Sequence, residues 1–107
     1  MYRVASGRSP VEEWIGKLSA ADRARFAEVA DGIERYGFGC PRVTFRQLER
    51  KLWEIKFGTE TGGYRVAYGV IFRERMVWLH AFKKKRQRTP HGDLQVALRR
   101  MKEVLET

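Results

Sequence analysis

The 107-residue sequence has little cysteine, histidine or proline, and it has no long hydrophobic run. The single cysteine, Cys40, cannot form an intramolecular disulfide, which fits a reducing cytosol, so we expect a cytoplasmic protein. One cysteine and two histidines are too few for an ordinary structural zinc site, and we expect neither a metal nor another cofactor. No apolar run approaches the roughly 20 residues that cross a bilayer, and the N-terminus lacks the apolar segment of a signal peptide.

Positive charge is what the sequence has in excess, with 22 Lys and Arg against 13 Asp and Glu and a net charge of +9. Residues 1–40 hold six basic and six acidic side chains, residues 41–82 hold eight and four, and residues 83–107 hold eight and three. The whole excess therefore follows residue 40. A one-sided positive potential attracts polyanions, which favours a nucleic-acid ligand over the alternatives of simple solubility or an acidic protein partner.

Two amphipathic helices are predicted near the N-terminus, after a short strand at Met1–Ala5. Ser9-Pro10-Val11-Glu12 has the residues of a helix start, and Ser19-Ala20-Ala21-Asp22 repeats the capping pattern. Gly37 or Gly39 would end the second helix. The apolar positions at helical spacing are Val11, Trp14, Ile15 and Leu18 in the first helix, and Phe26, Val29, Ala30, Ile33 and Tyr36 in the second.

Three β-rich runs follow a loop over residues 37–48, in which residues 43–45 form at most a short extended piece. The third run, at residues 76–82, is apolar on both faces and is therefore central or covered. A last helix starts after Thr89-Pro90, with Thr89 as its cap. The sequence thus predicts one α+β domain over residues 1–107, with the order β-α-α-β-β-β-α and a twisted antiparallel sheet packed on helices.

One face of this sheet is predicted to remain uncovered, because the first two helices supply packing for the other. Pairing the first two runs with their aromatic side chains on one face puts Lys56 directly opposite Arg65 on the open face. Like charges in that position are unfavourable, and a phosphate site is a reason to tolerate them. The small residues Ala67 and Gly69 would leave a shallow concavity beside Arg65. The alternative is a solvated face with scattered cations.

The run Lys83-Lys84-Lys85-Arg86-Gln87-Arg88 follows the third strand and would add cations near the same surface. A soluble loop is the alternative for this run. His80 lies in an apolar strand and is expected to be packed and hydrogen-bonded, whereas His91 opens the last helix and is expected to be more exposed. Both histidines are reserve candidates for acid–base chemistry.

Several motifs together resemble the RelE/HigB superfamily of bacterial toxins, and in particular its phage-derived HigB-like branch. These motifs are Leu52-Trp53-Glu54-Ile55-Lys56, Tyr64-Arg65-Val66-Ala67-Tyr68, the segment from Leu79 to Lys85, Thr89-Pro90 and the upstream Pro10-Val11-Glu12-Glu13-Trp14. The resemblance implies a toxin that cleaves mRNA on the ribosome without a metal. It also implies a partner antitoxin, commonly a helix-turn-helix repressor, through which alone the toxin would meet promoter DNA; no membrane contact is expected.

The resemblance also implies site residues. Arg65 matches a catalytic arginine and Lys56 a basic position, whereas Glu54 stands where relatives carry a second basic residue. Arg65 would bind the phosphate, and a lysine whose pKa is lowered by neighbouring charge would act as base or acid. The predicted catalytic set is Lys56, Arg65, Lys84 and Lys85, and the predicted RNA-binding set is Lys51, Lys83, Arg86 and Arg88.

The general base stays open, because no tyrosine follows Tyr68 to match the C-terminal tyrosine of some relatives. A non-catalytic RNA- or ribosome-binding module is therefore the main alternative. DNA binding and a toxin-like protein retained for protein contacts are further alternatives.

Overall fold

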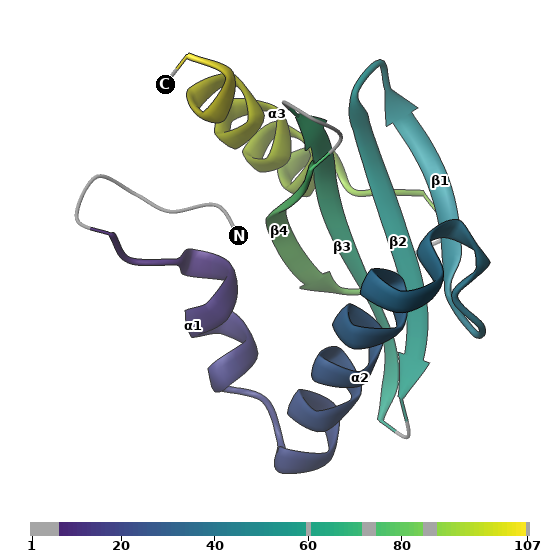
Figure 1. The fold of residues 1–107 in the computed structure, drawn as a ribbon. Helices are drawn as coiled ribbons and strands as arrows, with labels where there is room; N and C mark the ends of the chain where they lie inside the picture. The colour runs from purple at the N-terminus through teal and green to yellow at the C-terminus, as the bar shows by residue number, and fades with distance from the viewer. Residues whose placement is uncertain (1–6, 60, 72–74, 85–87, 107) are drawn as a thin grey trace.

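The computed structural model describes residues 7–59, 61–71, 75–84 and 88–106, with the side chain of Ile71 left aside. The strand predicted at Met1–Ala5 lies outside these residues. The described elements are the helices α1 (Pro10–Gly16), α2 (Ala20–Tyr36) and α3 (His91–Leu105), the 3-10 turn η1 (Gly37–Gly39), and the strands β1 (Thr44–Glu49), β2 (Leu52–Thr59), β3 (Gly62–Ile71) and β4 (Arg75–Lys83). Together they make the predicted small α+β domain (Figure 1).

The four described strands form one antiparallel sheet in the order β1-β2-β3-β4. The predicted hairpin register is confirmed, since Lys56 pairs with Arg65 and Phe57 with Tyr64. The prediction of a loop over residues 37–48 is wrong at its end, where β1 forms a full strand. Its backbone pairs with β2 from Thr44 opposite Lys56 onward. Partner hydrogen bonds, rather than the modest β-propensity of its own residues, make this segment a strand.

The helix termini follow local chemistry at three of the predicted places. The hydroxyls of Ser9 and Ser19 accept hydrogen bonds from the backbone N–H groups of Glu12 and Asp22, at 3.3 and 3.2 Å. Gly37, at φ +57°, ends α2 in a conformation that costs a glycine little. The predicted cap at Thr89 is wrong. Pro90 is the N-cap of α3, and the Thr89 hydroxyl is engaged elsewhere.

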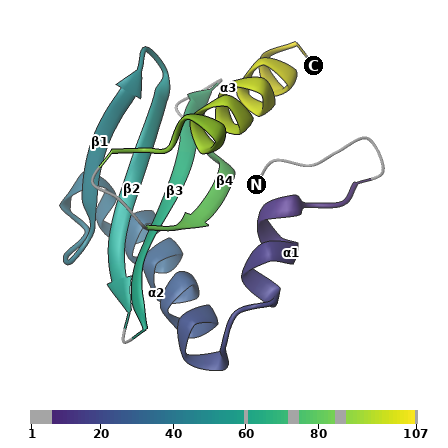
Figure 2. The ribbon, with the colours of Figure 1, turned by 180° about the vertical axis from the view of Figure 1, so that it is seen from behind.

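Helices cover both faces of the sheet, so the expectation of an open face is wrong. Helices α1 and α2 lie on one face and α3 crosses the other (Figures 1 and 2). On the α3 side, Ala67 of β3 packs in one buried cluster with Ala97 and Met101 of α3. Gly69 is buried as well. The small side chains predicted to leave a concavity instead allow close approach of α3 to the sheet.

The strand β4 is apolar on both faces because it is covered, not because it is central. It forms one edge of the described sheet. Trp78 joins the core on the α1 and α2 side, and Leu79, at a register shift of the β3–β4 ladder, joins the core on the α3 side. Consecutive strand residues point to opposite faces, so this one edge strand serves two separate cores.

Candidate functional site

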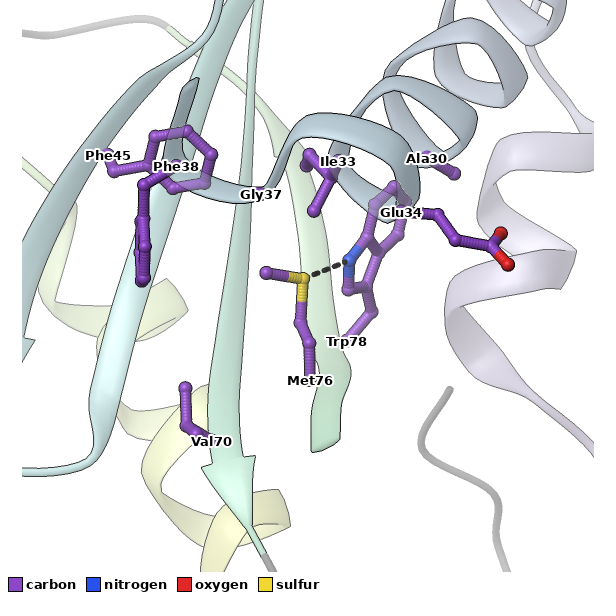
Figure 3. Close-up of a pocket in the computed structure, with 9 residues that line it drawn as sticks. All are labelled: Ala30, Ile33, Glu34, Gly37, Phe38, Phe45, Val70, Met76 and Trp78. Atoms are coloured by element: carbon purple, nitrogen blue, oxygen red, sulfur yellow. Dashed lines mark hydrogen bonds between the residues drawn. The ribbon is translucent and has the colours of Figure 1, made fainter. Parts of the chain in front are cut away.

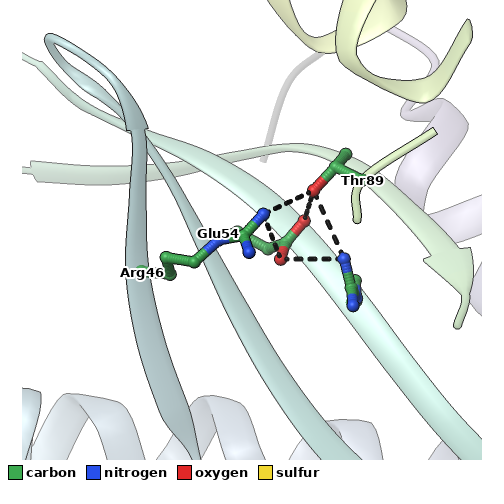
Figure 4. Close-up of polar contacts among 4 residues, drawn as sticks. Arg46, Glu54 and Thr89 are labelled. Carbon is green, nitrogen blue, oxygen red and sulfur yellow. Dashed lines mark hydrogen bonds and ion pairs between the residues drawn. The ribbon is translucent and has the colours of Figure 1, made fainter. Parts of the chain in front are cut away.

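A polar network lies on the α3 side of the sheet, around the carboxylate of Glu54. Thr89 Oγ1 donates a hydrogen bond to Glu54 Oε2 at 2.7 Å, and the NH1 group of Arg65 lies 3.4 Å from Glu54 Oε1. The NH2 group of Arg46 lies 4.0 Å from the same Oε1 atom. Both arginines also donate to Thr89 Oγ1, at 3.2 Å from Arg46 and 3.3 Å from Arg65 (Figure 4). One carboxylate and one hydroxyl therefore hold two guanidinium groups.

Strand register explains why these side chains meet. Arg46 of β1 pairs with Glu54 of β2, and Arg65 of β3 pairs with Lys56, two residues further along β2. Residues two apart on a strand share a face, so all four point to the α3 side. Residues 88–90 cross this face toward α3 and bring Thr89 to the network (Figure 2). The opposition of Lys56 and Arg65 is thus offset by Glu54, without need of a phosphate.

Burial divides the two arginines. The side chains of Arg65 and Glu54 are 2% and 3% exposed, whereas that of Arg46 is 51% exposed. Breaking a buried ion pair is costly, because removal of one partner leaves an uncompensated charge in a medium of low polarity. Arg65, the predicted phosphate ligand, is therefore buried, and its NH1 group faces the Glu54 carboxylate. The exposed guanidinium of the network belongs to Arg46.

Two of the predicted catalytic lysines lie on this same side of the sheet. Lys56 is half-buried opposite Arg65. Lys84, also half-buried, donates its backbone N–H to the Gly63 carbonyl at 2.8 Å, and its Cδ lies 3.3 Å from where a Gly63 Cβ would stand. Gly63 pairs with Gly58, which has nothing within 4 Å of where its Cβ would stand, so the open backbone on this face lies at Gly58 rather than at the predicted Ala67.

The predicted RNA-binding residues are scattered. Arg88 is exposed and directly precedes Thr89, beside the network. Lys83 is exposed but points to the opposite face, where its charge lowers the pKa of Asp22 as the smallest of several contributions. Lys51 lies before the start of β2, about 17 Å from Lys56 by strand geometry. Lys85 and Arg86 lie outside the described residues.

Arg46, Lys56, Lys84 and Arg88 together are called the cationic surface below. They are exposed or half-buried, and they lie on or beside the α3 side of the sheet. Arg46 is the residue that sequence reasoning missed, because it depended on recognising β1 as a strand paired with β2. The local sequence signal for this strand was the position of the apolar Phe45 between the polar Thr44 and Arg46.

The reserve histidines differ in environment. His80 Nε2 lies 2.7 Å from Asp93 Oδ1, and the NH1 group of Arg100 lies 3.4 Å from His80 Nδ1. Because a guanidinium only donates, Nδ1 must accept and Nε2 must carry the proton toward Asp93. Burial lowers the pKa of His80, although Asp93 opposes this effect. Both ring nitrogens are thus occupied, as expected of a packed histidine, while His91 is exposed at the first position of α3.

An apolar groove on the opposite face is the other candidate site (Figure 3). Its volume is about 620 Å³, and its residues are Ala30, Ile33, Glu34, Gly37, Phe38, Phe45, Val70, Met76 and Trp78. The Trp78 indole N–H donates to the sulfur of Met76 at 3.3 Å (Figure 3). Among the described residues that line the groove, Glu34 alone carries a charge, and its carboxylate makes the groove a poor site for a polyanion.

Other kinds of site find no support within the part of the chain that the structure describes. No three His, Cys, Asp or Glu side chains gather there in a way that could hold a metal ion. None of its helices has the length and apolar character needed to cross a membrane. The cationic surface is therefore the candidate site with the clearest chemistry, namely attraction of phosphate groups.

Comparison with known proteins identifies a family for the chain. No curated protein matches the chain. Residues 13–102, which extend from α1 into the last turns of α3, match the family described as phage-derived protein Gp49-like (DUF891). Membership of a toxin–antitoxin family implies a cognate antitoxin as partner. The chain belongs to the Gp49-like family of phage-derived proteins, a family associated with the toxins of toxin–antitoxin systems.

Proposed function

We propose that this protein is a toxin of the RelE/HigB type, in the phage-derived HigB-like branch, which cleaves mRNA on the ribosome without a metal ion. The observation that carries the proposal is the family match over residues 13–102. The partner would be an antitoxin of helix-turn-helix type, which would also bring the toxin to promoter DNA. The site of action is the cytoplasm, where translating ribosomes are found.

The cationic surface is the proposed RNA site. Single-stranded RNA presents one phosphate per nucleotide, and exposed cations bind it by releasing counterions. Lys56 lies two residues before Gly58, which has nothing within 4 Å of where its Cβ would stand, and the Lys84 side chain lies over Gly63, the partner of Gly58. Arg88 extends the surface along the segment that leads to α3. Lys85 and Arg86 are proposed to add to the cationic surface. Lys51 and Lys83 would contact only RNA that extends beyond the edges of this surface.

Cleavage would use the 2′-hydroxyl of the RNA itself as nucleophile. A base removes the 2′-hydroxyl proton, the 2′-oxygen bonds to phosphorus, and the bond from phosphorus to the 5′-oxygen breaks as an acid protonates that oxygen. The products are a 2′,3′-cyclic phosphate and a 5′-hydroxyl. We assign the base and acid to the set Lys56, Lys84 and Lys85, and we assign Arg65 the positioning of Glu54 rather than direct phosphate contact.

A non-catalytic RNA- or ribosome-binding module is the second candidate function. One observation favours it: His80 has both ring nitrogens occupied by Asp93 and Arg100, so it has no lone pair for a substrate proton. His91 is then the remaining histidine for acid–base chemistry. A binding module needs only the cations of the same surface.

The decisive experiment incubates purified protein with an mRNA, with and without ribosomes, and maps 5′-hydroxyl ends. An EDTA arm is run on free RNA only, because ribosomes require magnesium. The test variant is K56A/K84A, and the control is R35A, which removes an exposed arginine of α2 on the opposite side of the sheet. Thermal unfolding verifies that both variants fold.

Ribosome-dependent cuts that disappear in K56A/K84A but persist in R35A would support the toxin mechanism. Salt-sensitive binding to RNA or ribosomes without any product would overturn cleavage and establish the binding module. A protein that neither cleaves nor binds RNA would refute both functions.

A further inference from the structure

We propose that Arg46 is the phosphate-binding arginine of this protein, and that Arg65 acts behind it as a positioning residue. The inference rests on the proposed function, since it names the group that receives the RNA phosphate. It arises from the structure alone, because the resemblance points to Arg65. The ligand would be a phosphodiester group of single-stranded RNA.

Exposure separates the two guanidinium groups. That of Arg65 is buried, and its NH1 group faces both Glu54 and Thr89. Arg46 uses only its NH2 group in the described contacts, namely the bond to Thr89 and the longer approach to Glu54. A guanidinium has five N–H donors, and the N–H donors on Nε and NH1 of Arg46 take part in none of these described contacts, so they can donate to phosphate oxygens.

The charges of the network favour the same assignment. Two guanidinium groups share the single carboxylate of Glu54, which leaves one positive charge in excess. Arg65 is in the closer ion pair, at 3.4 Å against 4.0 Å for Arg46. The excess is therefore presented to solvent by Arg46. Buried charges contribute little to the binding of an external polyanion, whereas an exposed cation attracts it directly.

Preorganisation is the role that this arrangement gives to the buried residues. The Thr89 hydroxyl donates to Glu54 and accepts from Arg46, so it fixes the end of a long side chain that would otherwise adopt many rotamers. Holding a side chain in place before binding lowers the entropy lost on association. Arg46 is also a diagonal neighbour of Lys56 on the sheet, which places a second cation beside the bound phosphate.

The test measures binding of a fluorescent single-stranded RNA oligonucleotide by anisotropy, over a series of salt concentrations. R46A is compared with wild type, with R46K and R46Q, and with the control R35A. We expect R46A to weaken binding about tenfold, as expected for loss of a charged hydrogen bond. Its plot of log affinity against log salt should be shallower by about 0.7, the value for one lost phosphate contact on a single strand.

The conservative variants separate phosphate binding from a structural role. R46K keeps the charge but loses the fork, so it should keep the wild-type salt dependence while binding more weakly. R46Q keeps much of the side-chain length without charge and should match R46A, which makes the test independent of whether R46A folds. R35A should behave as wild type.

The outcomes are distinct for the two proposals. If wild type binds RNA and R46A and R46Q retain its affinity and salt dependence, the assignment of Arg46 is overturned and the proposed function stands. If R46K behaves as R46A in salt dependence, a charge-based role is likewise refuted. A wild-type protein that binds no RNA, free or on ribosomes, would overturn the proposed function and this inference with it.

Discussion

The two faces of this sheet are packed by different physical means. On the side of α1 and α2, aromatic rings meet edge to face. The centroid of the Phe26 ring lies 4.9 Å from that of the Phe57 ring and 5.1 Å from that of the Tyr64 ring. On the side of α3, a cluster of aliphatic side chains lies beside a carboxylate held between two guanidinium groups. The first face depends on buried area, which is non-directional and tolerant. The second depends on specific partners.

This difference matters for function, because the network of Arg46, Glu54, Arg65 and Thr89 and the cationic surface both belong to the second face. The groove on the aromatic side has one carboxylate, from Glu34, whereas the α3 side has the cationic surface. On the α3 side, Glu54 and Thr89 contact the Arg46 guanidinium, so this exposed cation has a defined position. The comparison therefore predicts that mutations on the two faces differ in both size and sign.

The largest effect is expected at Arg65. R65A should lower the free energy of unfolding by about 3–5 kcal/mol, because it leaves the Glu54 carboxylate buried beside a cavity. Urea unfolding measures this loss. Loss of cleavage by R65A would thus reflect unfolding as much as chemistry, which is why the activity test uses other variants.

Replacing both partners is the control for R65A. The double variant E54L/R65M removes the two buried charges together and should be more stable than R65A, since no buried charge is left without its partner and Arg46 is 51% exposed to water. A loss of less than about 0.5 kcal/mol in R65A would contradict the importance of the buried pair.

A smaller, pH-dependent effect is expected at Asp22, the buried carboxylate at the border of the aromatic face. Thr61 Oγ1 and the Tyr64 hydroxyl each donate to Asp22 Oδ2 at 2.6 Å. These bonds, that from Thr61 first, lower the pKa of Asp22 below its ordinary value of 3.8. Burial, followed by the bond to Asp22, raises the pKa of Tyr64.

The sign for Asp22 follows from this lowered pKa. Ionised Asp22 stabilises the folded state. This contribution is fully present above pH 3.8, the ordinary pKa of an aspartate, and is lost as the pH falls through the lower pKa of Asp22 in the folded state. Thermal unfolding from pH 5 to pH 2 should show a decline in Tm, and D22N should show a flatter one. An equally steep decline in D22N would assign the acid sensitivity to other carboxylates.

The smallest effect, of opposite sign, is expected at Tyr68. This residue is fully buried, its hydroxyl has no hydrogen-bond partner among the described residues, and burial raises the pKa of Tyr68 to about 12. Y68F should stabilise the protein by about 1 kcal/mol, because it removes an unsatisfied buried polar group. Urea unfolding of Y68F beside wild type measures the gain. A loss of similar size would mean that the hydroxyl has a partner after all.

Local chemistry made much of the fold predictable. The caps at Ser9 and Ser19 and the pairing of Lys56 with Arg65 were confirmed, since each depends on residues close in sequence or on a regular alternation. The resemblance to toxins is confirmed at the level of a toxin–antitoxin family. The branch, the reaction and the roles of the site residues stay predictions.

The site itself was less predictable. Lys56 and Lys84 share the α3 side as expected, but Lys83 lies on the other side, because alternate residues of a strand point in opposite directions. Arg65 is buried rather than open, and Arg46 was not anticipated. Both outcomes depend on Glu54 and Thr89, which are 35 residues apart in sequence and meet only when the chain is folded.

The sequence by itself determined the α+β class, the helix starts, the hairpin register and the location of the positive charge, because these follow from residue type and short-range spacing. Only the tertiary structure decided that β1 completes the sheet, that α3 covers the second face and that Glu54 pairs with Arg65. Those features depend on the packing of distant segments, and burial then fixes which cation pairs internally and which remains exposed to a ligand.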